Sequence, residues 1–259
     1  MRVIVTRPEP EASRWVADLA GRGYDALALP LIAIAPASHP EAALAVQTAW
    51  QGLAQYNAVM FVSGNAVIHF FAVAPSQPVW PTAGPRCWAP GPGTQHALVQ
   101  AGVAAACIDA PPADAGQFDS EALWQVVQGS VRSGQRVLVV RGSDAAGQGA
   151  GRDWMAQQLT AAGAQVDTVE AYERRAPQFT PQQVALARAA AVDGAVWLFS
   201  SSEAIGNLQS ALQPANWSRA RAVATHPRIA EAARTAGFGV VCASRPALAA
   251  VVASIESIQ

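Results

Sequence analysis

Small polar residues, glycine and arginine directly follow six predicted strands, and a parallel sheet binds its ligands at that end of its strands. Five of these six segments lead at once into a predicted helix, whose first turn presents free N–H groups and a partial positive charge. Such helix starts bind carboxylates or phosphates with little help from side chains. For any single Ser or Thr, the alternative is that it caps its helix and binds no ligand. The predicted anion site therefore depends on the whole set of segments. The segments are Thr6-Arg7-Pro8, Ser63-Gly64-Asn65, Pro90-Gly91-Pro92-Gly93-Thr94, Arg141-Gly142-Ser143, Ser200-Ser201-Ser202 and Thr225-His226-Pro227-Arg228.

Three arginines in these segments could recognise a carboxylate through a planar, permanently charged guanidinium. Arg7 and Arg141 occupy matching positions after their strands, and a surface ion pair is the alternative for each. Arg228 stands at a predicted helix start, where its charge opposes the helix dipole and a bound anion would relieve that conflict. His226 is interpreted as a turn residue rather than as an acid or base.

Tyr172 is the one tyrosine of three that falls at a predicted crossover between domains, in Glu170-Ala-Tyr172-Glu-Arg-Arg-Ala-Pro177. We expect a strand to end at this residue. Its phenol could donate a proton at the mouth of a binding site, and the alternative is an aromatic ring packed at a hinge.

Residue counts exclude several common chemistries. All 17 basic residues are Arg, so the lysine of a Schiff base, a P-loop or a kinase site is absent. Three separated Cys and four scattered His have no metal-site spacing, so we expect no metal. Gly91-Pro-Gly93-Thr-Gln-His96 lacks the third glycine of a dinucleotide fingerprint, and the Gly-rich residues 144–151 are expected to form a loop.

The elements that must position these residues alternate between short apolar runs and Ala-rich stretches of helical period. Hydrophobic residues make up 51% and charged residues 14%, which is typical of a globular chain. Continuous apolar strands separated by helices indicate an α/β fold whose parallel sheets are covered on both faces. The clearest strands are Val3–Val5, Ala58–Val62, Arg86–Ala89, Arg136–Val140, Ala195–Phe199 and Arg221–Ala224, and the helices include Glu11–Gly21, Thr94–Ala101, Ser120–Gln128, Arg152–Ala162 and Pro227–Ala236.

An internal repeat predicts two similar doubly wound lobes. Three pairs of strand segments, which begin at Arg2 and Arg136, Ala58 and Ala195, and Arg86 and Arg221, are offset by 134, 137 and 135 residues. We expect residues 1–35 and 175–259 to form one discontinuous lobe and residues 38–172 to form the other. Extended, Pro-marked linkers near 34–40 and 172–177 would join them, with a cleft for one polyanion between the lobes.

Overall charge gives little indication of a macromolecular partner. The formal net charge of −1 disfavours a general nucleic-acid binder and a polybasic membrane-surface protein. No run of about 18 apolar residues predicts a membrane span, and the start of the chain is unlike a signal peptide. We therefore expect a cytoplasmic protein, and nothing in the sequence requires an oligomer.

Taken in order, these motifs resemble the uroporphyrinogen-III synthase family over nearly the whole chain. The similar segments are Val3-Ile-Val-Thr-Arg-Pro8, Leu29-Pro-Leu-Ile-Ala-Ile34, Val59-Met-Phe-Val-Ser-Gly-Asn-Ala-Val67, Pro90-Gly-Pro-Gly-Thr94, Leu138-Val-Val-Arg-Gly142, Val169-Glu-Ala-Tyr-Glu-Arg175 and Ala224-Thr-His-Pro-Arg-Ile-Ala-Glu-Ala-Ala-Arg234. The resemblance implies a bilobed fold and a cofactor-free reaction, in which linear hydroxymethylbilane loses its hydroxyl and closes to uroporphyrinogen III with ring D inverted. Its substrate carries eight carboxylates, which suits the predicted anion site.

The resemblance also implies roles for particular residues. Tyr172 matches the tyrosine that the family places to assist loss of the hydroxyl. Several segments depart from the family, because Val62 stands where Thr is frequent, His226 where Gly is frequent, and Arg228-Ile229 where some members have Thr-Thr. The residues that match the family's ligand-contact segments are Ser63, Gly64, Asn65, Thr94, Ser200, Ser201 and Ser202, and we add Gly93, Arg7, Arg141 and Arg228 as expected substrate contacts.

Two other functions stay open at this point. A non-enzymatic two-lobe binding protein for a small polycarboxylate would have a similar build. A regulatory protein made of two receiver-like halves would need an acidic pocket at the strand ends, and these segments instead carry Ser, Thr and Arg.

Overall fold

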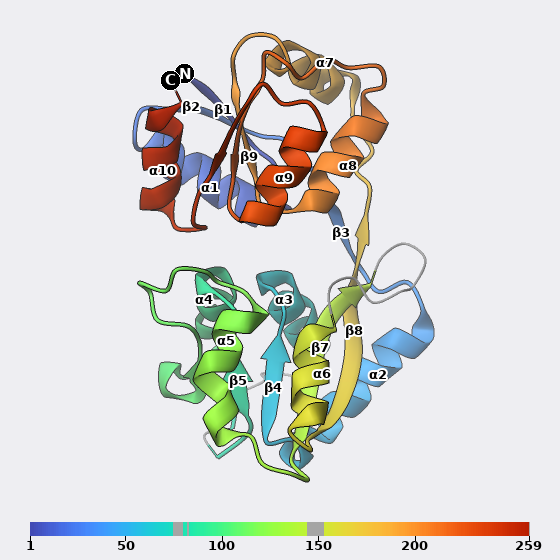
Figure 1. Ribbon diagram of the computed structural model, residues 1–259. Coiled ribbons are helices and arrows are strands. Elements are labelled where there is room, and N and C mark those ends of the chain that lie inside the picture. The colour runs from blue at the N-terminus through green and yellow to red at the C-terminus, as the bar shows by residue number, and fades with distance from the viewer. Residues whose placement is uncertain (75–79, 82, 144–152, 259) are drawn as a thin grey trace. The chain divides into compact units, whose positions relative to one another are not determined.

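The computed structural model describes residues 1–74, 80–81, 83–143 and 153–258 (Figure 1). It divides into two compact units: unit 1 comprises Met1–Ala33 and Arg175–Gln259, and unit 2 comprises Ile34–Arg174. The loop expected at 144–151 and the helix start expected at Arg152 lie outside the described residues.

Unit 1 is built on a five-stranded sheet in the order β11-β10-β9-β1-β2. Its neighbouring strands are parallel, and Val3 of β1 lies opposite both Ala26 and Val196. The central strand β9 is apolar and buried throughout, and β1 and β10 are buried after a first arginine, as a sheet between two helical layers requires. The strands are β1 (Arg2–Val5), β2 (Asp25–Ala28), β9 (Val196–Phe199), β10 (Arg221–Ala224) and β11 (Val240–Ala243).

Helices cover both faces of this sheet. The first and last of them, α1 and α10, pack on the face that carries Val3, Val196 and Val223. The other face carries Trp197, whose indole N–H donates to the carbonyl oxygen of Ala190 in α7 at 3.1 Å, and α8 and α9 lie on that side (Figure 1). The helices are α1 (Glu11–Ala20), α7 (Pro181–Ala190), α8 (Ser202–Ala211), α9 (Pro227–Thr235) and α10 (Leu248–Ser257).

Unit 2 is built on a six-stranded sheet in the order β3-β8-β7-β4-β5-β6. The strand pairs from β8 to β6 are parallel. The register is regular from Arg136 opposite Gln165 to Arg141 opposite Glu170, and then one extra residue of β8 places Gly142 opposite Tyr172. The strands are β3 (Ala33–Pro36), β4 (Ala58–Phe61), β5 (Arg86–Trp88), β6 (Ile108–Asp109), β7 (Arg136–Ser143) and β8 (Gln165–Arg175).

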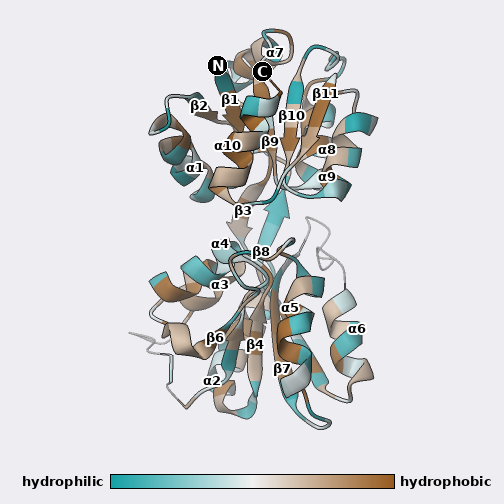
Figure 2. Cartoon of the chain, turned by 60° about the vertical axis from the view of Figure 1, so that its left-hand side comes forward, coloured by the Kyte–Doolittle hydropathy of each residue, from teal (hydrophilic) through white to brown (hydrophobic). Residues whose placement is uncertain are grey.

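Two helical layers enclose the sheet of unit 2 as well. Phe70 of α3 packs in a core with Val59 and Leu138 on one face, and α2 and α4 contribute to the same core. Leu123 of α5 packs with α6 against the opposite face, and Figure 2 shows α5 in alternating brown and teal bands, as an amphipathic helix requires. The helices are α2 (Pro40–Gln51), α3 (Gly64–Ala72), α4 (Pro92–Gln100), α5 (Ser120–Val127) and α6 (Trp154–Ala161), with short 3₁₀ turns at Leu53–Gln55, Ala105–Cys107 and Gln128–Ser130.

The strand orders of the two units confirm the internal repeat. The order β2-β1-β9-β10-β11 in unit 1 corresponds to β8-β7-β4-β5-β6 in unit 2, and unit 2 adds β3 at one edge. The repeated segments that begin at Arg2 and Arg136 are thus equivalent strands, β1 and β7. Chain order differs between the units, because the pair β1–β2 precedes its three companion strands whereas β7–β8 follows them.

Several predicted boundaries were wrong. The strand expected to end at Val140 is β7, which continues through Ser143, so Arg141, Gly142 and Ser143 lie within the strand rather than after it. Six predicted strands are present, each starting within one residue of the expected position, but β8 continues past Tyr172 to Arg175 because Glu173 still lies in register with Ser143 of β7. The helix expected from Thr94 begins at Pro92, since the fixed φ of proline suits the first helical position.

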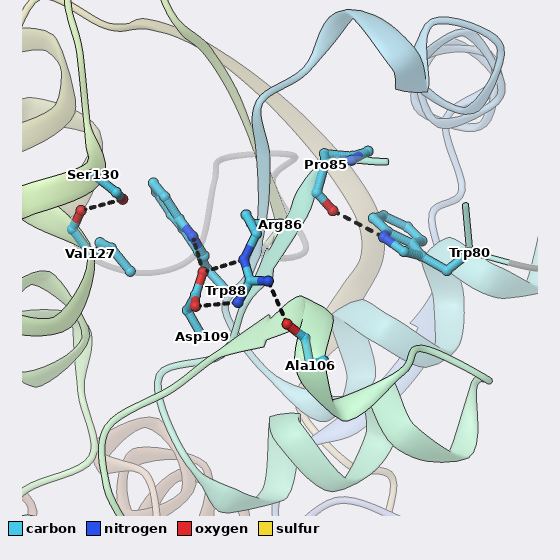
Figure 3. A network of polar contacts seen from close by, with 8 residues as sticks. All are labelled: Trp80, Pro85, Arg86, Trp88, Ala106, Asp109, Val127 and Ser130. Carbon is cyan, nitrogen blue, oxygen red and sulfur yellow. Dashed lines mark hydrogen bonds and ion pairs between the residues drawn. The ribbon is translucent and has the colours of Figure 1, made fainter. Parts of the chain in front are cut away.

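Side chains secure the short edge strand β6. The Asp109 carboxylate accepts hydrogen bonds from Arg86 Nε at 3.0 Å, from Arg86 Nη2 and from the indole N–H of Trp88 at 3.1 Å (Figure 3). Arg86 and Trp88 stand two residues apart on β5, so both point to the same face of the sheet. The network therefore adds side-chain bonds to a strand with only two residues of backbone pairing.

Candidate active site

Ser63 and Tyr172 meet in unit 2 at the carboxyl ends of β4 and β8. Their hydroxyl oxygens lie 3.0 Å apart, and either group could be the donor. Ser63 is also the N-cap of α3, where its Oγ accepts a hydrogen bond from the backbone N–H of Ala66 at 3.2 Å. The structure thus brings together two residues that the sequence analysis selected separately.

The Tyr172 ring is almost fully buried, with 3% of the residue exposed. It stacks against the imidazole of His69, with 5.6 Å between ring centroids and an interplanar angle of 27°. It also lies directly on Gly142, where an added Cβ would come within 2.5 Å of the ring carbon that bears the hydroxyl. A phenol held in this way has a fixed ring and a polar partner for its hydroxyl.

Sequence reasoning gave no role to His69 or to the contact of Gly142 with Tyr172. His69 stands alone in the apolar sequence Ala66-Val-Ile-His-Phe-Phe71, so no neighbouring residue signals its contact with Tyr172. Partial burial lowers the pKa of His69 from its ordinary value, because desolvation disfavours the charged imidazolium. The imidazole is therefore mostly neutral at neutral pH.

Glu173, next to Tyr172, is a second residue that the sequence analysis did not select. Its carboxylate is buried and accepts hydrogen bonds from the backbone N–H and the hydroxyl of Ser38. This contact ties the segment after β3 to the end of β8, within unit 2.

The starts of α3 and α4 form a second part of the site in unit 2. A Cβ placed on Gly64 would lie 3.6 Å from the carbonyl oxygen of Gly93, so the segments 63–65 and 92–94 are neighbours. Asn65 and Gly93 are partly exposed, whereas Thr94 lies in the first turn of α4 and is buried. The first turns of α3 and α4 therefore lie next to each other, and the Thr94 side chain is buried.

In unit 1 the corresponding helix starts are those of α8 and α9. Ser200 is partly exposed, Ser201 is the N-cap of α8, and the buried Oγ of Ser202 has no hydrogen-bond partner among the residues that the structure describes. His226 is the N-cap of α9, and its Nδ1 accepts a hydrogen bond from the backbone N–H of Arg228 at 3.1 Å, so it has a structural role at the start of this helix. The Arg228 side chain is exposed and makes no ion pair within the described part of the chain.

Arg7 and Arg141 each bind a carboxylate of their own unit. Arg7 is 8% exposed, forms an ion pair with Glu11 at 2.9 Å and lies over the Trp15 ring at 4.6 Å, so the guanidinium is buried while the Glu11 side chain stays partly exposed. Arg141 pairs with Asp153, just before α6, and because the Asp153 side chain is 61% exposed this is a surface ion pair, the alternative stated for Arg141. Each arginine keeps a buried Nε without a hydrogen-bond partner among the described residues.

The described residues contain neither a cluster of metal ligands nor a membrane-spanning helix. In residues 1–74, 80–81, 83–143 and 153–258, no three His, Cys, Asp or Glu side chains come together as a metal site. Within the same part of the chain, no helix combines the length and the hydropathy needed to cross a membrane.

Comparison with known proteins gives one consistent result. The family model described as "Uroporphyrinogen-III synthase HemD" matches residues 13–253. A crystal structure of uroporphyrinogen-III synthetase from Helicobacter pylori is similar at 14% identity and a TM-score of 0.60, covering all of both chains. A mutant uroporphyrinogen III synthase from Thermus thermophilus is similar at 18% identity and a TM-score of 0.55, covering all of this chain and 98% of that one. At these identities the solved structures establish the fold, and the family match extends over nearly the whole chain.

Proposed function

The chain belongs to the uroporphyrinogen-III synthase family, whose members cyclise hydroxymethylbilane with inversion of ring D, and from this premise we propose how its own residues carry out that reaction. The family match carries the assignment of the activity, that of a lyase-type enzyme of tetrapyrrole biosynthesis. The observation that carries the proposed mechanism is the hydrogen-bonded pair of Ser63 and Tyr172. No comparison favours the binding-protein or receiver-like alternatives.

Substrate binding is assigned to the helix starts of both units. The linear tetrapyrrole carries eight carboxylates, and each helix start offers unpaired N–H groups and a partial positive charge. The proposed contacts are Ser63, Gly64, Asn65, Gly93 and Thr94 in unit 2 and Ser200, Ser201 and Ser202 in unit 1. Because Thr94 is buried, its contact is made through the backbone N–H rather than the hydroxyl.

Arg228 is the arginine best able to meet a substrate carboxylate at once, because its side chain is exposed at the start of α9. Arg7 and Arg141 are also assigned to bind substrate carboxylates. Each must first break its ion pair, with Glu11 or Asp153, so we expect them to bind the substrate more slowly than Arg228. Their unpartnered Nε groups, within the described residues, leave donors available for that exchange.

Tyr172 is assigned the role of general acid. Its hydroxyl proton passes to the departing hydroxyl of hydroxymethylbilane, the carbon–oxygen bond breaks, water leaves, and an azafulvene cation remains. The substituted carbon of ring D then attacks this cation through a spiro intermediate, which leads to the inverted ring. A phenol with an ordinary pKa near ~10 is a weak acid, so most of the catalysis comes from holding the chain in the reacting geometry.

We also propose that the enzyme acts as a cytoplasmic monomer. The formal net charge of −1 favours neither a nucleic-acid nor a membrane-surface partner. Light scattering after size-exclusion chromatography tests the oligomeric state, and cell fractionation tests the compartment.

A coupled assay from porphobilinogen tests the activity itself. The expected result is type III porphyrin after oxidation of the product. If only type I porphyrin forms, at the rate of spontaneous ring closure, the proposed function is wrong.

A further inference from the structure

Three elements of unit 2 hold the Tyr172 ring and its hydroxyl. Helix α3 supplies Ser63 at the hydroxyl and His69 at the ring. Strand β7 supplies Gly142, whose missing side chain leaves the space that the ring occupies. Strand β8 supplies Tyr172 itself, immediately after the extra residue that shifts the register. These contacts fix the place of the ring, its plane and the position of its oxygen.

The two contacts from α3 act on different degrees of freedom. A hydrogen bond at the hydroxyl restrains the end of the side chain but leaves the ring free to tilt. Stacking on His69 restrains the plane of the ring, and offset-stacked rings at this centroid distance attract each other. The hydroxyl contact thus comes from the N-cap of α3 and the ring contact from its last turn.

The position of the phenol matters more than its acidity for the proposed reaction. A general acid must lie within hydrogen-bond reach of the atom that it protonates. A displacement of about 1 Å costs on the order of a hundredfold in rate. A group that keeps the ring in place would thus affect turnover without touching the substrate.

We propose that His69 is a positioning residue, which stacks on Tyr172 and holds its hydroxyl where the proton transfer requires it. This inference rests on the acid role proposed above for Tyr172. Burial favours the neutral imidazole, so His69 places little positive charge beside the cationic intermediate.

Fluorine NMR tests the positioning without reference to activity. The chain has three tyrosines, so labelling with 3-fluorotyrosine gives three assignable environments, and the resonance lost in Tyr172→Phe identifies Tyr172. We expect His69→Ala to shift or broaden this resonance and His69→Phe, which keeps an aromatic ring, to restore it largely. The matched control is His96→Ala on α4, an exposed histidine, which should leave the resonance unchanged.

Steady-state kinetics test the consequence for the reaction. We expect His69→Ala to lower kcat about tenfold with little change in KM, and His69→Phe to recover most of the loss. In a Tyr172→Phe background the same change should have no further effect on kcat, because the group that it positions is gone.

The outcomes separate this inference from the proposal on which it rests. If Tyr172→Phe keeps full turnover, the acid role is wrong, whatever the NMR shows. If Tyr172→Phe is slow but His69→Ala leaves the Tyr172 resonance and kcat unchanged, the acid role stands and the positioning role is wrong. Equal losses from His69→Ala in both backgrounds also contradict positioning, since the effect would not act through Tyr172.

Discussion

At the scale of single residues, Tyr172 shows why two interpretations of one side chain could not be separated from sequence. Its ring is part of a hydrophobic core cluster, as a packed hinge aromatic would be, yet its hydroxyl has a polar partner in Ser63. The sequence predicted both residues as members of the site, but their contact joins positions 109 residues apart. No local pattern encodes such a contact, because it depends on which strands become neighbours in the sheet.

Tyr172→Phe removes the proposed acid and keeps the buried ring. We expect kcat to fall about tenfold, a small effect for general acid catalysis because a phenol is a weak acid. Affinity for uroporphyrinogen III should stay within about twofold, since binding is assigned to other residues. Assays of kcat and of product binding check both values, and a kcat equal to that of the wild type would remove the acid role.

Arg228→Ala removes the exposed cation at the start of α9. We expect product affinity to fall severalfold at low ionic strength and the difference to shrink as salt screens the interaction. Arg234→Ala, near the other end of the same helix, is the matched control, because that arginine pairs with Glu231. Equal affinities for Arg228→Ala and wild type at low salt would show that Arg228 does not contact the ligand.

The pKa of His69 predicts a pH dependence of stability. Burial lowers the pKa in the folded state, so the unfolded chain takes up this proton at a higher pH than the folded chain does. The corresponding part of the stability is thus present above the ordinary histidine pKa of 6.5 and is lost as pH falls through the lowered value. Urea unfolding from about pH 7.5 to about pH 5 should show a steeper loss for wild type than for His69→Phe, and parallel curves would contradict the shift.

At the scale of elements, the register shift between β7 and β8 determines where Tyr172 lies. One extra residue in β8 gives three successive buried residues, Ala171, Tyr172 and Glu173, in place of simple alternation. The sequence predicted that this strand ends at Tyr172, because the segment that follows is marked by prolines, as a linker would be. A bulge can be predicted only when the partner strand is known. The position of Tyr172 relative to β7 could therefore not be predicted from the sequence.

Gly142→Ala tests this close approach. Because the new methyl would overlap the ring, the ring or the strand must move, at a cost of about 1–3 kcal/mol in the free energy of unfolding. Turnover should fall with it, since the Tyr172 hydroxyl is displaced. Gly64→Ala offers a control at a site where the added carbon has only ordinary contacts, and it should change stability by about 1 kcal/mol or less. Equal losses in the free energy of unfolding for Gly142→Ala and Gly64→Ala would show that the contact of Gly142 with Tyr172 does not constrain the fold.

Asp109→Asn tests the network at the edge strand β6. The amide replaces an acceptor that binds two groups of Arg86 and the Trp88 indole, so we expect a loss of about 1 kcal/mol in the free energy of unfolding. Asp25→Asn is the matched control, because its ion pair with Arg2 lies at the surface and should contribute about 0.5 kcal/mol or less. Chemical denaturation measures both, and no difference between the two variants would mean that the network does not stabilise the edge.

At the scale of the whole molecule, pattern and repetition predicted more than single residues did. Strand starts were correct within one residue because apolar runs of four or five residues between Ala-rich helices have few other interpretations. The internal repeat predicted two similar sheets, and the shared strand order confirms it. What the sequence could not provide were contacts between distant elements, such as those of Tyr172 with His69 and with Ser63. Ion pairs of Arg7 and Arg141 were among its alternatives, and the structure supplies their partners, Glu11 and Asp153.

The split of unit 1 along the chain has a consequence for synthesis on the ribosome. Val3 pairs with Val196, so β1 cannot meet its neighbour β9 until more than three quarters of the chain has been translated. Unit 2 is one uninterrupted segment, and all its strands have been translated before β9 is made. Since domains fold as units during translation, nascent chains should acquire the second sheet first. A slow stretch of codons after residue 174 would then favour correct folding of the final third.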